Sequence, residues 1–464
     1  MELKINKFKI ASLFIGMIIP IIICVVLSRS LVIGFFIATV IDVTLLVQYG
    51  FKSKSLIDMM WASIVECKNI YMLILLIGAT VSIWLASGVV PALIYYGSYL
   101  LKDSNFILMA FLIVMVCSAF IGSAIATIST IGIAIIGIGV SFNIPANLLL
   151  GVVVSGAYVA DKISPLSGLF NLTIESANTK FKETIKNMMR TFIPTIIIVS
   201  IIYYLIGMKY MGGNDILEVL KLQDMIKESF NISPLLLIIP IIVVLLSMKG
   251  FGALKSISMG CFVGTIATYF YQNVDVIQIF KWIIFGYKSI SQYEYINNLL
   301  FSGGIFSMLE VIFIIMGAVS IGGLLEKTGV LRLALNSFIN RRLDKNTLII
   351  KTSIISILLT VLTCDQTMGI IIPSKFFKEK FDELALKREV LVRTISDSGT
   401  IVAPLMPWNI NAIIIASVTG ISSGYAVFSI LCFIFPLVTI AVSLIENMRR
   451  KGDENYVRRS ISKI

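Results

Sequence analysis

The stretch IASLFIGMIIPIIICVVL, residues 10–27, contains no charged side chain. It approaches the roughly 20 apolar residues that a helix needs to cross a bilayer. Similar runs recur at residues 191–208, 233–248 and 425–445. Strands of a membrane barrel alternate over shorter segments, so continuous runs favour helices. The sequence therefore predicts helical membrane spans.

Composition extends this prediction to the whole chain. Of the 464 residues, 58% are hydrophobic and 14% are charged, and the mean hydropathy is +0.96. Soluble domains carry about 25% charged residues. We expect an all-α polytopic membrane protein with roughly 10–13 membrane segments, a count left open because several apolar runs are short or broken.

The net charge of +12 is expected to set topology. The N-terminal MELKINKFK and the C-terminal MRRKGDENYVRRSISK are both basic. Positive charge near spans favours the cytoplasmic side, so both termini are expected there, in the cytoplasmic membrane, after an even number of crossings. The lipid bilayer is thus the expected partner, and nucleic acid is not. No small-residue cleavage site follows Val26, so the first span is expected to be retained.

The cysteine and histidine content and the absence of enzyme motifs narrow the range of possible functions. Six cysteines are scattered without a CxxC pair, which predicts neither a disulfide framework nor a metal centre. The chain has no histidine, so a proton-linked step must use carboxylates, or a lysine with an altered pKa. There is no P-loop, GxSxG or HExxH motif, and we expect neither an enzyme nor a cofactor.

A weak internal repeat divides the chain. Residues 82–90 resemble 321–331, residues 129–138 resemble 365–374, and residues 160–171 resemble 396–409, each about 240 positions later. We expect a first repeat with extra N-terminal spans at 1–208, a polar linker at 209–232, a second repeat at 233–445 and a basic tail at 446–464. If each repeat has an odd number of spans, the two are inverted. Chance similarity between glycine-rich membrane segments is the alternative.

The first candidate site is GAYVADKISPLSGLFNLT, residues 156–173. Pro165 disfavours helix at Ser164, and unwound backbone at membrane depth is tolerated where it lines a cavity. Its oxygens could then bind a small cation such as Na⁺. The alternative is a surface loop in which Asp161 and Lys162 form a solvated pair. The candidate binding residues are Asp161, Ser164, Ser167 and Asn171.

The second candidate site is LLTVLTCDQTMGIIIPSKFFKEKF, residues 358–381. Polar residues interrupt two short apolar runs, and Pro373 is expected to end the second. This predicts a re-entrant hairpin with Thr363, Asp365 and Gln366 near its tip. An ordinary loop between two spans is the alternative.

The third candidate site is DSGTIVAPLMPWNIN, residues 397–411. Pro404 and Pro407 break the pattern, and the side chains around them are rich in oxygen. A broken helix lining a site explains this composition, and the helix N-termini at such a break also attract anions. The candidate residues are Asp397, Ser398, Gly399, Thr400, Trp408 and Asn409.

Two further places carry acids. Glu326 and Lys327 in GGLLEKTG, residues 322–329, read best as an interfacial pair at a helix end. Asp42 is a lone acid inside an apolar run and is a weak candidate for a proton carrier.

These stretches resemble those of the NhaC family of Na⁺/H⁺ antiporters. The resemblance rests on SGAYVADKISPLSGLFNLT (155–173), GGLLEKTGVL (322–331), TCDQTMGIIIPSKFFKEKF (363–381) and VRTISDSGTIVAPLMPWNINA (392–412), in the order of the family. It implies a multi-pass secondary transporter with inverted repeats around a midplane site. Members of the family exchange Na⁺ for H⁺, exchange malate for lactate, or carry amino acids with Na⁺.

The chain also departs from the family pattern. The usual DTTN is GLFN at residues 168–171, and the early GTSWGTxGT is GSAIATIST at residues 122–130. Both changes remove oxygen ligands or glycines from the first half, whereas the second-half motifs are intact. We hypothesise that the first-half ion site is weakened and that the second-half site remains, with Asp161 as the remaining first-half carboxylate.

Na⁺/H⁺ antiport is therefore the expected function. The expected Na⁺ ligands are Asp397, Ser398, Thr400 and Asp365, and a carboxylate takes up H⁺ when Na⁺ leaves. One alternative is Na⁺-coupled transport of an amino acid or small carboxylate, including malate/lactate-type exchange. Another is a sensor without flux. The substrate, the stoichiometry and the oligomeric state, a homodimer included, stay open.

Overall fold

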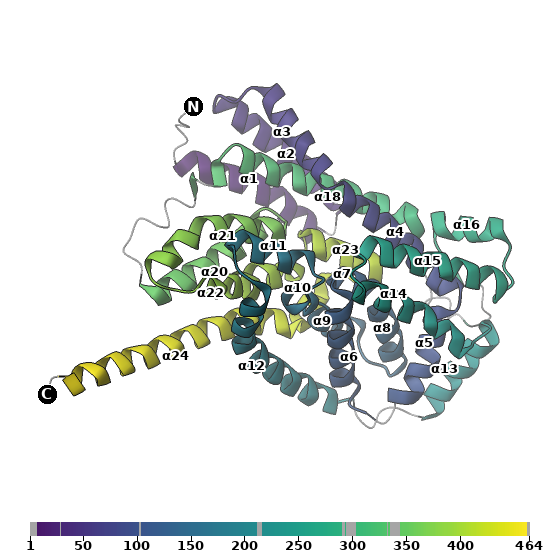
Figure 1. The fold of residues 1–464 in the computed structure, drawn as a ribbon. Coiled ribbons are helices and arrows are strands. Elements are labelled where there is room, and N and C mark those ends of the chain that lie inside the picture. The colour runs from purple at the N-terminus through teal and green to yellow at the C-terminus, as the bar shows by residue number, and fades with distance from the viewer. Residues whose placement is uncertain are drawn as a thin grey trace.

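The computed structural model describes residues 7–27, 29–101, 104–210, 216–289, 293, 303–331, 333–334 and 344–461. Every regular element within these ranges is a helix (Figure 1). Among the described residues, nine helices are long and apolar enough to cross a membrane, and there are up to eleven spans if each of the two bent helix pairs counts as one span. This confirms the all-α polytopic prediction and overlaps the expected span count.

An N-terminal hairpin packs on the second half of the chain. It is formed by α1 (Lys7–Val26) and α2 (Leu31–Gln48), and α3 (Ser53–Glu66) follows. Helix α2 lies along α18 (Gly304–Lys327), where Gly317 leaves room for the ring of Phe35. Figure 1 shows α1, α2, α3 and α18 gathered on one side of the molecule.

The rest of the first half is a series of helices that is interrupted at residues 164–167. It comprises α4 (Lys68–Ala86), α5 (Val89–Leu101), α6 (Phe106–Ile121), α7 (Ala124–Thr127), η1 (Ile128–Gly132), α8 (Ile133–Ser141), α9 (Ala146–Ala157), α10 (Ala160–Ile163), α11 (Gly168–Ala177) and α12 (Phe181–Met208). As Pro165 predicts, residues 164–167 are not helical.

The middle of the chain is more helical than a simple linker. Helix α13 (Ile216–Ser229) lies within the predicted linker 209–232 and packs on α5, where Gln223 donates to the carbonyl of Tyr95 at 2.9 Å. The chain continues through η2 (Pro234–Leu237), α14 (Ile238–Met248), α15 (Ala253–Phe270) and α16 (Val276–Phe285).

The second half contains a helical hairpin and a broken helix where each was predicted, although residues 345–362, the first helix of the hairpin, are long and apolar enough to cross the membrane. It comprises α18, α20 (Lys345–Leu362), α21 (Gln366–Glu383), α22 (Arg388–Ile395), η3 (Ser396–Thr400), η4 (Ala403–Leu405), α23 (Ile410–Thr419), η5 (Ser423–Phe428) and α24 (Ile430–Ile461). The predicted tail, 446–464, begins inside α24, which extends far from the bundle in Figure 1.

One local prediction was wrong: Pro373 does not end its helix. Helix α21 continues to Glu383 although proline lacks the N–H that would bond to the carbonyl of Gly369. The hydroxyl of Ser356 on α20 donates to that carbonyl instead, at 2.6 Å. The neighbouring helix thus satisfies the acceptor that Pro373 leaves free.

Left-handed residues recur along the two halves in the same order. Gly88, Gly122, Asn143 and Asn178 have positive φ, and so do Gly329, Cys364, Ala385 and Gly420, each about 240 positions later. The capping residues Ser123 and Ser167 have counterparts in Asp365 and Asn409 at the same spacing. At the same spacing, the first-half residue that corresponds to Asp397 is Ser155.

Two apolar cores fill the interior. The first includes Trp84, Phe111 and Tyr203, and the second includes Phe377 and Phe381. Large apolar side chains such as Ile197 and Phe262 are exposed, as expected where helices face lipid.

Candidate functional site

Asp397 lies in a π-helical turn between two helices. Residues 396–400 form η3, and the chain then passes through η4 before bending by 46° into α23. Extra residues in a helical turn are frequent at functional sites. The predicted broken helix is therefore present, with its acid fully buried at the break.

Both carboxylate oxygens of Asp397 have a partner. Lys162 of α10 forms an ion pair with Oδ1, and the hydroxyl of Thr439 on α24 donates to Oδ2. The ammonium of Lys162 also lies 3.9 Å from the ring centroid of Phe435. Three segments that are distant in the sequence thus meet at one carboxylate.

Lys162 corrects one reading of the sequence. The alternative of a solvated Asp161–Lys162 pair is wrong, because these residues are only 7% and 1% exposed. The apolar helix α9 leads the chain into the interior of the protein, and the short helix α10 follows it there. The side chain of Lys162 on α10 points toward α24. The Asp161–Lys162 part of the predicted loop is therefore in the core, whereas Pro165, Gly168 and Asn171 are exposed.

A second buried cation lies one helical turn before Asp397. Arg393 is fully buried, and its Nη2 atom lies 3.5 Å from both Ser443 Oγ and Glu446 Oε2. The other oxygen of Glu446 pairs with Arg190 of α12 at 2.7 Å. This chain of charges ties α22, α24 and α12 together beside the Lys162–Asp397 pair.

Asp161 is held by first-half residues. The hydroxyl of Ser167 donates to it at 3.1 Å, and the backbone N–H of Ala124 lies near its carboxylate. Ser167 also caps α11 by accepting from the N–H of Phe170. Asp161 therefore sits among donors suited to a carboxylate, next to Lys162 but apart from the partners of Asp397.

The predicted hairpin tip docks the start of α23. Thr363 donates to the carbonyls of Leu359 and Asp365, and Asp365 caps α21 by accepting from Thr367. From the opposite segment, Trp408 donates to the carbonyl of Val361 at 3.1 Å and Asn409 to that of Thr360 at 3.4 Å. The structure brings these predicted residues together, but Asp365 accepts from Thr367 whereas Asp397 contacts Lys162 and Thr439.

Three of the predicted ligands donate side-chain hydrogen bonds to backbone carbonyls. Ser398 donates to the carbonyl of Thr394, Ser164 to that of Ala119 and Asn171 to that of Pro165. Asn171 is also exposed. These side chains stabilise the local turns.

Other buried oxygens near the break have no partner among the described residues. They belong to Thr400 and Gln366, which were predicted, and to Ser396 and Thr360, which were not. They lie on η3, α20 and α21, which pack together; a Cβ at Gly399 would come within 2.8 Å of the carbonyl oxygen of Ser356. Buried oxygens without donors are the groups that a small hard cation could use.

Two residues of the GLFN departure differ in their surroundings. Gly168 is exposed and its missing side chain would face open space, whereas Phe170 is fully buried with its ring 5.7 Å from that of Phe181. The apolar replacement therefore fills the core between α11 and α12.

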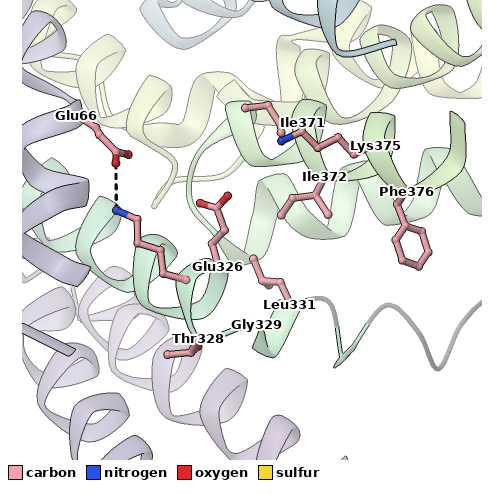
Figure 2. A pocket seen from close by; sticks show the side chains of 10 residues that line it. Glu66, Glu326, Thr328, Gly329, Leu331, Ile371, Ile372, Lys375 and Phe376 are labelled. Atoms are coloured by element: carbon pink, nitrogen blue, oxygen red, sulfur yellow. Dashed lines mark hydrogen bonds and ion pairs between the residues drawn. The ribbon is translucent and has the colours of Figure 1, made fainter. Parts of the chain in front are cut away.

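A cavity of about 830 Å³ lies where α18 ends (Figure 2). Its charged lining comes from the predicted Glu326–Lys327 pair, from Glu66 and from Lys375 of α21. Lys327 pairs across the cavity edge with Glu66 at 3.1 Å, not with its neighbour. Figure 2 shows Glu326 and Lys375 on separate walls.

Sequence reasoning missed Lys162, Thr439, Phe435 and Arg393 as site residues. The apolar run GVVVSGAYVA before Lys162 was a usable signal that this lysine is buried. Thr439 and Phe435 lie in an ordinary apolar run, where nothing distinguishes a site residue from a lipid-facing one.

Known proteins resemble this chain over most of its length. The sequence model of a family described as the Na⁺/H⁺ antiporter family matches residues 156–446. The Na⁺/H⁺ antiporter NhaC of Alkalihalophilus pseudofirmus is 31% identical over 79% of each chain. The malate-2H⁺/Na⁺-lactate antiporter of Bacillus subtilis is 30% identical over 88% of each. The arginine/ornithine antiporter ArcD of Halobacterium salinarum is 30% identical over 80% of this chain and 78% of its own.

Proposed function

Because this chain belongs to the Na⁺/H⁺ antiporter family, we propose that it exchanges Na⁺ for H⁺ across the cytoplasmic membrane, as a transporter and not an enzyme. The observation that carries the proposal is the buried carboxylate of Asp397 at the break between α22 and α23. Burying a charge in a membrane protein is costly, so such acids usually mark an ion pathway.

Asp397 is the proposed Na⁺-binding carboxylate. Thr400 and Gln366 would complete the ion's coordination, because their buried oxygens have no partner among the described residues. Ser398 and Asp365, also predicted as ligands, could keep their present hydrogen bonds, because the Ser398 hydroxyl only donates and Asp365 accepts through Oδ1 alone. No resident cofactor is part of this proposal, since Na⁺ and H⁺ are the transported ions.

We also propose that residues 1–208 and 233–445 hold two inverted repeats. The recurrence of left-handed turns and caps about 240 positions apart supports this division. Both termini would be cytoplasmic because both are basic. A homodimer remains a prediction from the sequence.

Transport by the purified protein in liposomes tests the exchange. Liposomes would contain a pH-sensitive dye and hold an imposed proton gradient before Na⁺ is added outside. We expect Na⁺ to move protons, and Asp397→Asn to abolish the effect. Asp275→Asn is the matched control, because Asp275 is exposed and asparagine can replace it as the cap of α16. No proton movement with Na⁺, or full activity in Asp397→Asn, would refute the assignment.

An organic solute is the second candidate substrate. The relatives described as a malate-2H⁺/Na⁺-lactate antiporter and an arginine/ornithine antiporter are as similar to this chain as the NhaC antiporter is. The cavity at the end of α18 has carboxylates and ammonium groups on its walls, which suits a solute bearing both charges. Proton movement that requires an added amino acid or carboxylic acid would favour this candidate, and binding without flux would favour a sensor.

A further inference from the structure

We propose that Glu326 and Lys375 form an ion pair that closes the cavity at the end of α18 during transport. This inference rests on the proposed Na⁺/H⁺ exchange and names a residue pair that regulates access to its site. In the structure the two side chains lie on separate walls of the cavity (Figure 2). The closed arrangement is therefore a second state, in which the walls have come together.

The two walls meet near the predicted hairpin tip. On the first wall, a Cβ at Gly322 of α18 would lie 3.2 Å from the carbonyl oxygen of Thr363 at that tip. Glu326 follows Gly322 by four residues, which is about 6 Å along a helix. On the second wall, α21 begins at the tip with Gln366 and lines the cavity from Ile371 onward. The cavity thus separates two helices that approach each other at the tip.

The two walls also belong to different groups of helices. Helix α18 packs on α2, α3 and α4, and Lys327 at its end pairs with Glu66 of α3 at 3.1 Å. Helix α21 packs on α11, α20 and α22. Helix α18 also contacts α23, which starts beside the tip, where the N–H of Ile410 donates to the carbonyl of Cys364 at 3.0 Å. Contacts near the tip could therefore act as a pivot while the far end of the cavity closes.

The facing walls carry complementary groups. Within the described part of the chain, the side chains of Glu326 and Lys375 form no hydrogen bond or ion pair. Leu331 lines the first wall, and Ile372 and Phe376 line the second. Closure would pair the two charges and remove apolar surface from water, and both effects favour the closed state.

A simple attraction of Na⁺ explains the lining less well. The charged lining consists of two carboxylates, Glu66 and Glu326, and two ammonium groups, Lys327 and Lys375, so these charges cancel. Such a cavity has little net field with which to concentrate cations. One acid and one base on facing walls are instead suited to a contact that forms and breaks.

Reversal of the charges in liposomes tests the proposal. In Glu326→Lys and in Lys375→Glu, like charges would face each other on closure, so each variant should exchange Na⁺ for H⁺ about fivefold more slowly. The double variant carries the two charges in exchanged positions and should regain most of the wild-type rate. High concentrations of choline chloride should reduce the loss in the single variants, because salt screens charges near the surface.

Lys380 and Glu383 provide the matched control. They also form an exposed ion pair, at 2.8 Å, but both lie on α21 and keep their separation when the walls move. Lys380→Glu, Glu383→Lys and their double variant should therefore transport at the wild-type rate. Thermal unfolding of every variant checks that its fold is retained.

Cross-linking reports closure without measuring transport. Glu326→Cys and Lys375→Cys would be combined in a variant without the six native cysteines and oxidised with copper phenanthroline in detergent. We expect a disulfide within the chain, detected by mass spectrometry, because the two Cα atoms come close enough when the walls meet. In liposomes the same oxidation should stop exchange, and a reductant should restore it. Each single-cysteine variant is the control.

The outcomes separate this inference from the proposed function. If Na⁺ moves no protons in the wild type but the disulfide forms, the proposed exchange fails while closure of the cavity is still supported. If the wild type exchanges Na⁺ and Lys375→Glu is faster still, the cavity acts through its field, and only the inference is overturned. Slow single variants that the double variant does not rescue would give the two residues independent roles, as in a solute site, and overturn it too. Normal transport by both single variants without disulfide formation, or a disulfide that leaves exchange intact, would also overturn it.

Discussion

Asp397 and Lys162 come from opposite halves of the sequence and meet where neither is exposed to water. Removing one member of such a pair typically costs about 3–5 kcal/mol, because the other charge stays buried alone. Removing both avoids that cost. The two side chains should therefore be coupled in stability as well as in transport.

This coupling can be measured by thermal unfolding in detergent. We expect Asp397→Asn to lower the unfolding temperature, and the double variant with Lys162→Met to recover much of the loss. Transport should stay absent in both. A double variant at least as unstable as the sum of the two single changes would show that the pair does not act as a unit.

Asp42 provides a contrasting prediction. It is fully buried on α2, and neither of its oxygens has a partner among the described residues. A lone buried acid is held most easily in its neutral form, which asparagine resembles in shape. We expect Asp42→Asn to leave Na⁺-driven proton movement and its pH dependence unchanged. Loss of either would make Asp42 the proton carrier that the sequence weakly suggested.

Single residues were predictable where their chemistry conflicted with the apolar pattern. Asp397 and Gln366 stood out as polar groups between apolar runs, and both are buried. Lys162 also follows an apolar run but was not predicted as a site residue, because the order of residues could not show that its partner lies on η3. Thr439 could not be found, because threonine is ordinary in a membrane helix and its contact is made only in three dimensions.

Close packing of helical elements positions Asp397. Gly399 follows it by two residues and lets η3 approach the backbone of α20 at Ser356. The same Ser356 supports α21 by donating to Gly369. One small residue thus lets three elements share a narrow space, and a larger residue would have to separate them.

Gly399→Ala should therefore reduce both stability and transport, although it changes no charge. A methyl group there would lie 2.8 Å from the carbonyl oxygen of Ser356, so backbone would have to move. Gly168→Ala is the matched control, since nothing lies within 4 Å of the added carbon. Thermal unfolding and proton movement in liposomes would compare them. Equal behaviour of the two variants would contradict this account.

The breaks between elements were easier to predict than the form of each break. Pro165, Pro404 and Pro407 marked real interruptions, and Asp365 marked a real hairpin turn. The π-helical turn at 396–400 has no sequence period of its own, so it was read only as a broken helix. Pro373 misled because a serine on the neighbouring helix replaces the missing hydrogen bond.

At the scale of the molecule, basic ends predict which face is cytoplasmic. The Glu66–Lys327 pair lies next to the start of α4, and the bond from Gln272 to the carbonyl of Ser87 lies at its other end. Because α4 is long enough to cross the membrane, these two contacts should lie on opposite sides.

Single cysteines in a variant without the six native ones would test this orientation. We expect Lys182→Cys and Glu379→Cys to react with a membrane-impermeant thiol reagent only from the cytoplasmic side, because both positions are exposed in lysine-rich segments. Asn273→Cys, next to Gln272, should react only from outside. The reverse labelling pattern would contradict the assigned orientation.

The left-handed turns that recur in the two halves bear on how the two halves evolved. If the two halves arose by duplication of one ancestral segment, Ser155 and Asp397 are descendants of one position. Today Ser155 shares a hydrogen bond with the hydroxyl of Tyr203 at 2.6 Å, and Tyr203 in turn bonds to the carbonyl of Phe428. One copy would then have become a fixed support while the other kept a titratable acid, and this divergence would leave a single exchange centre.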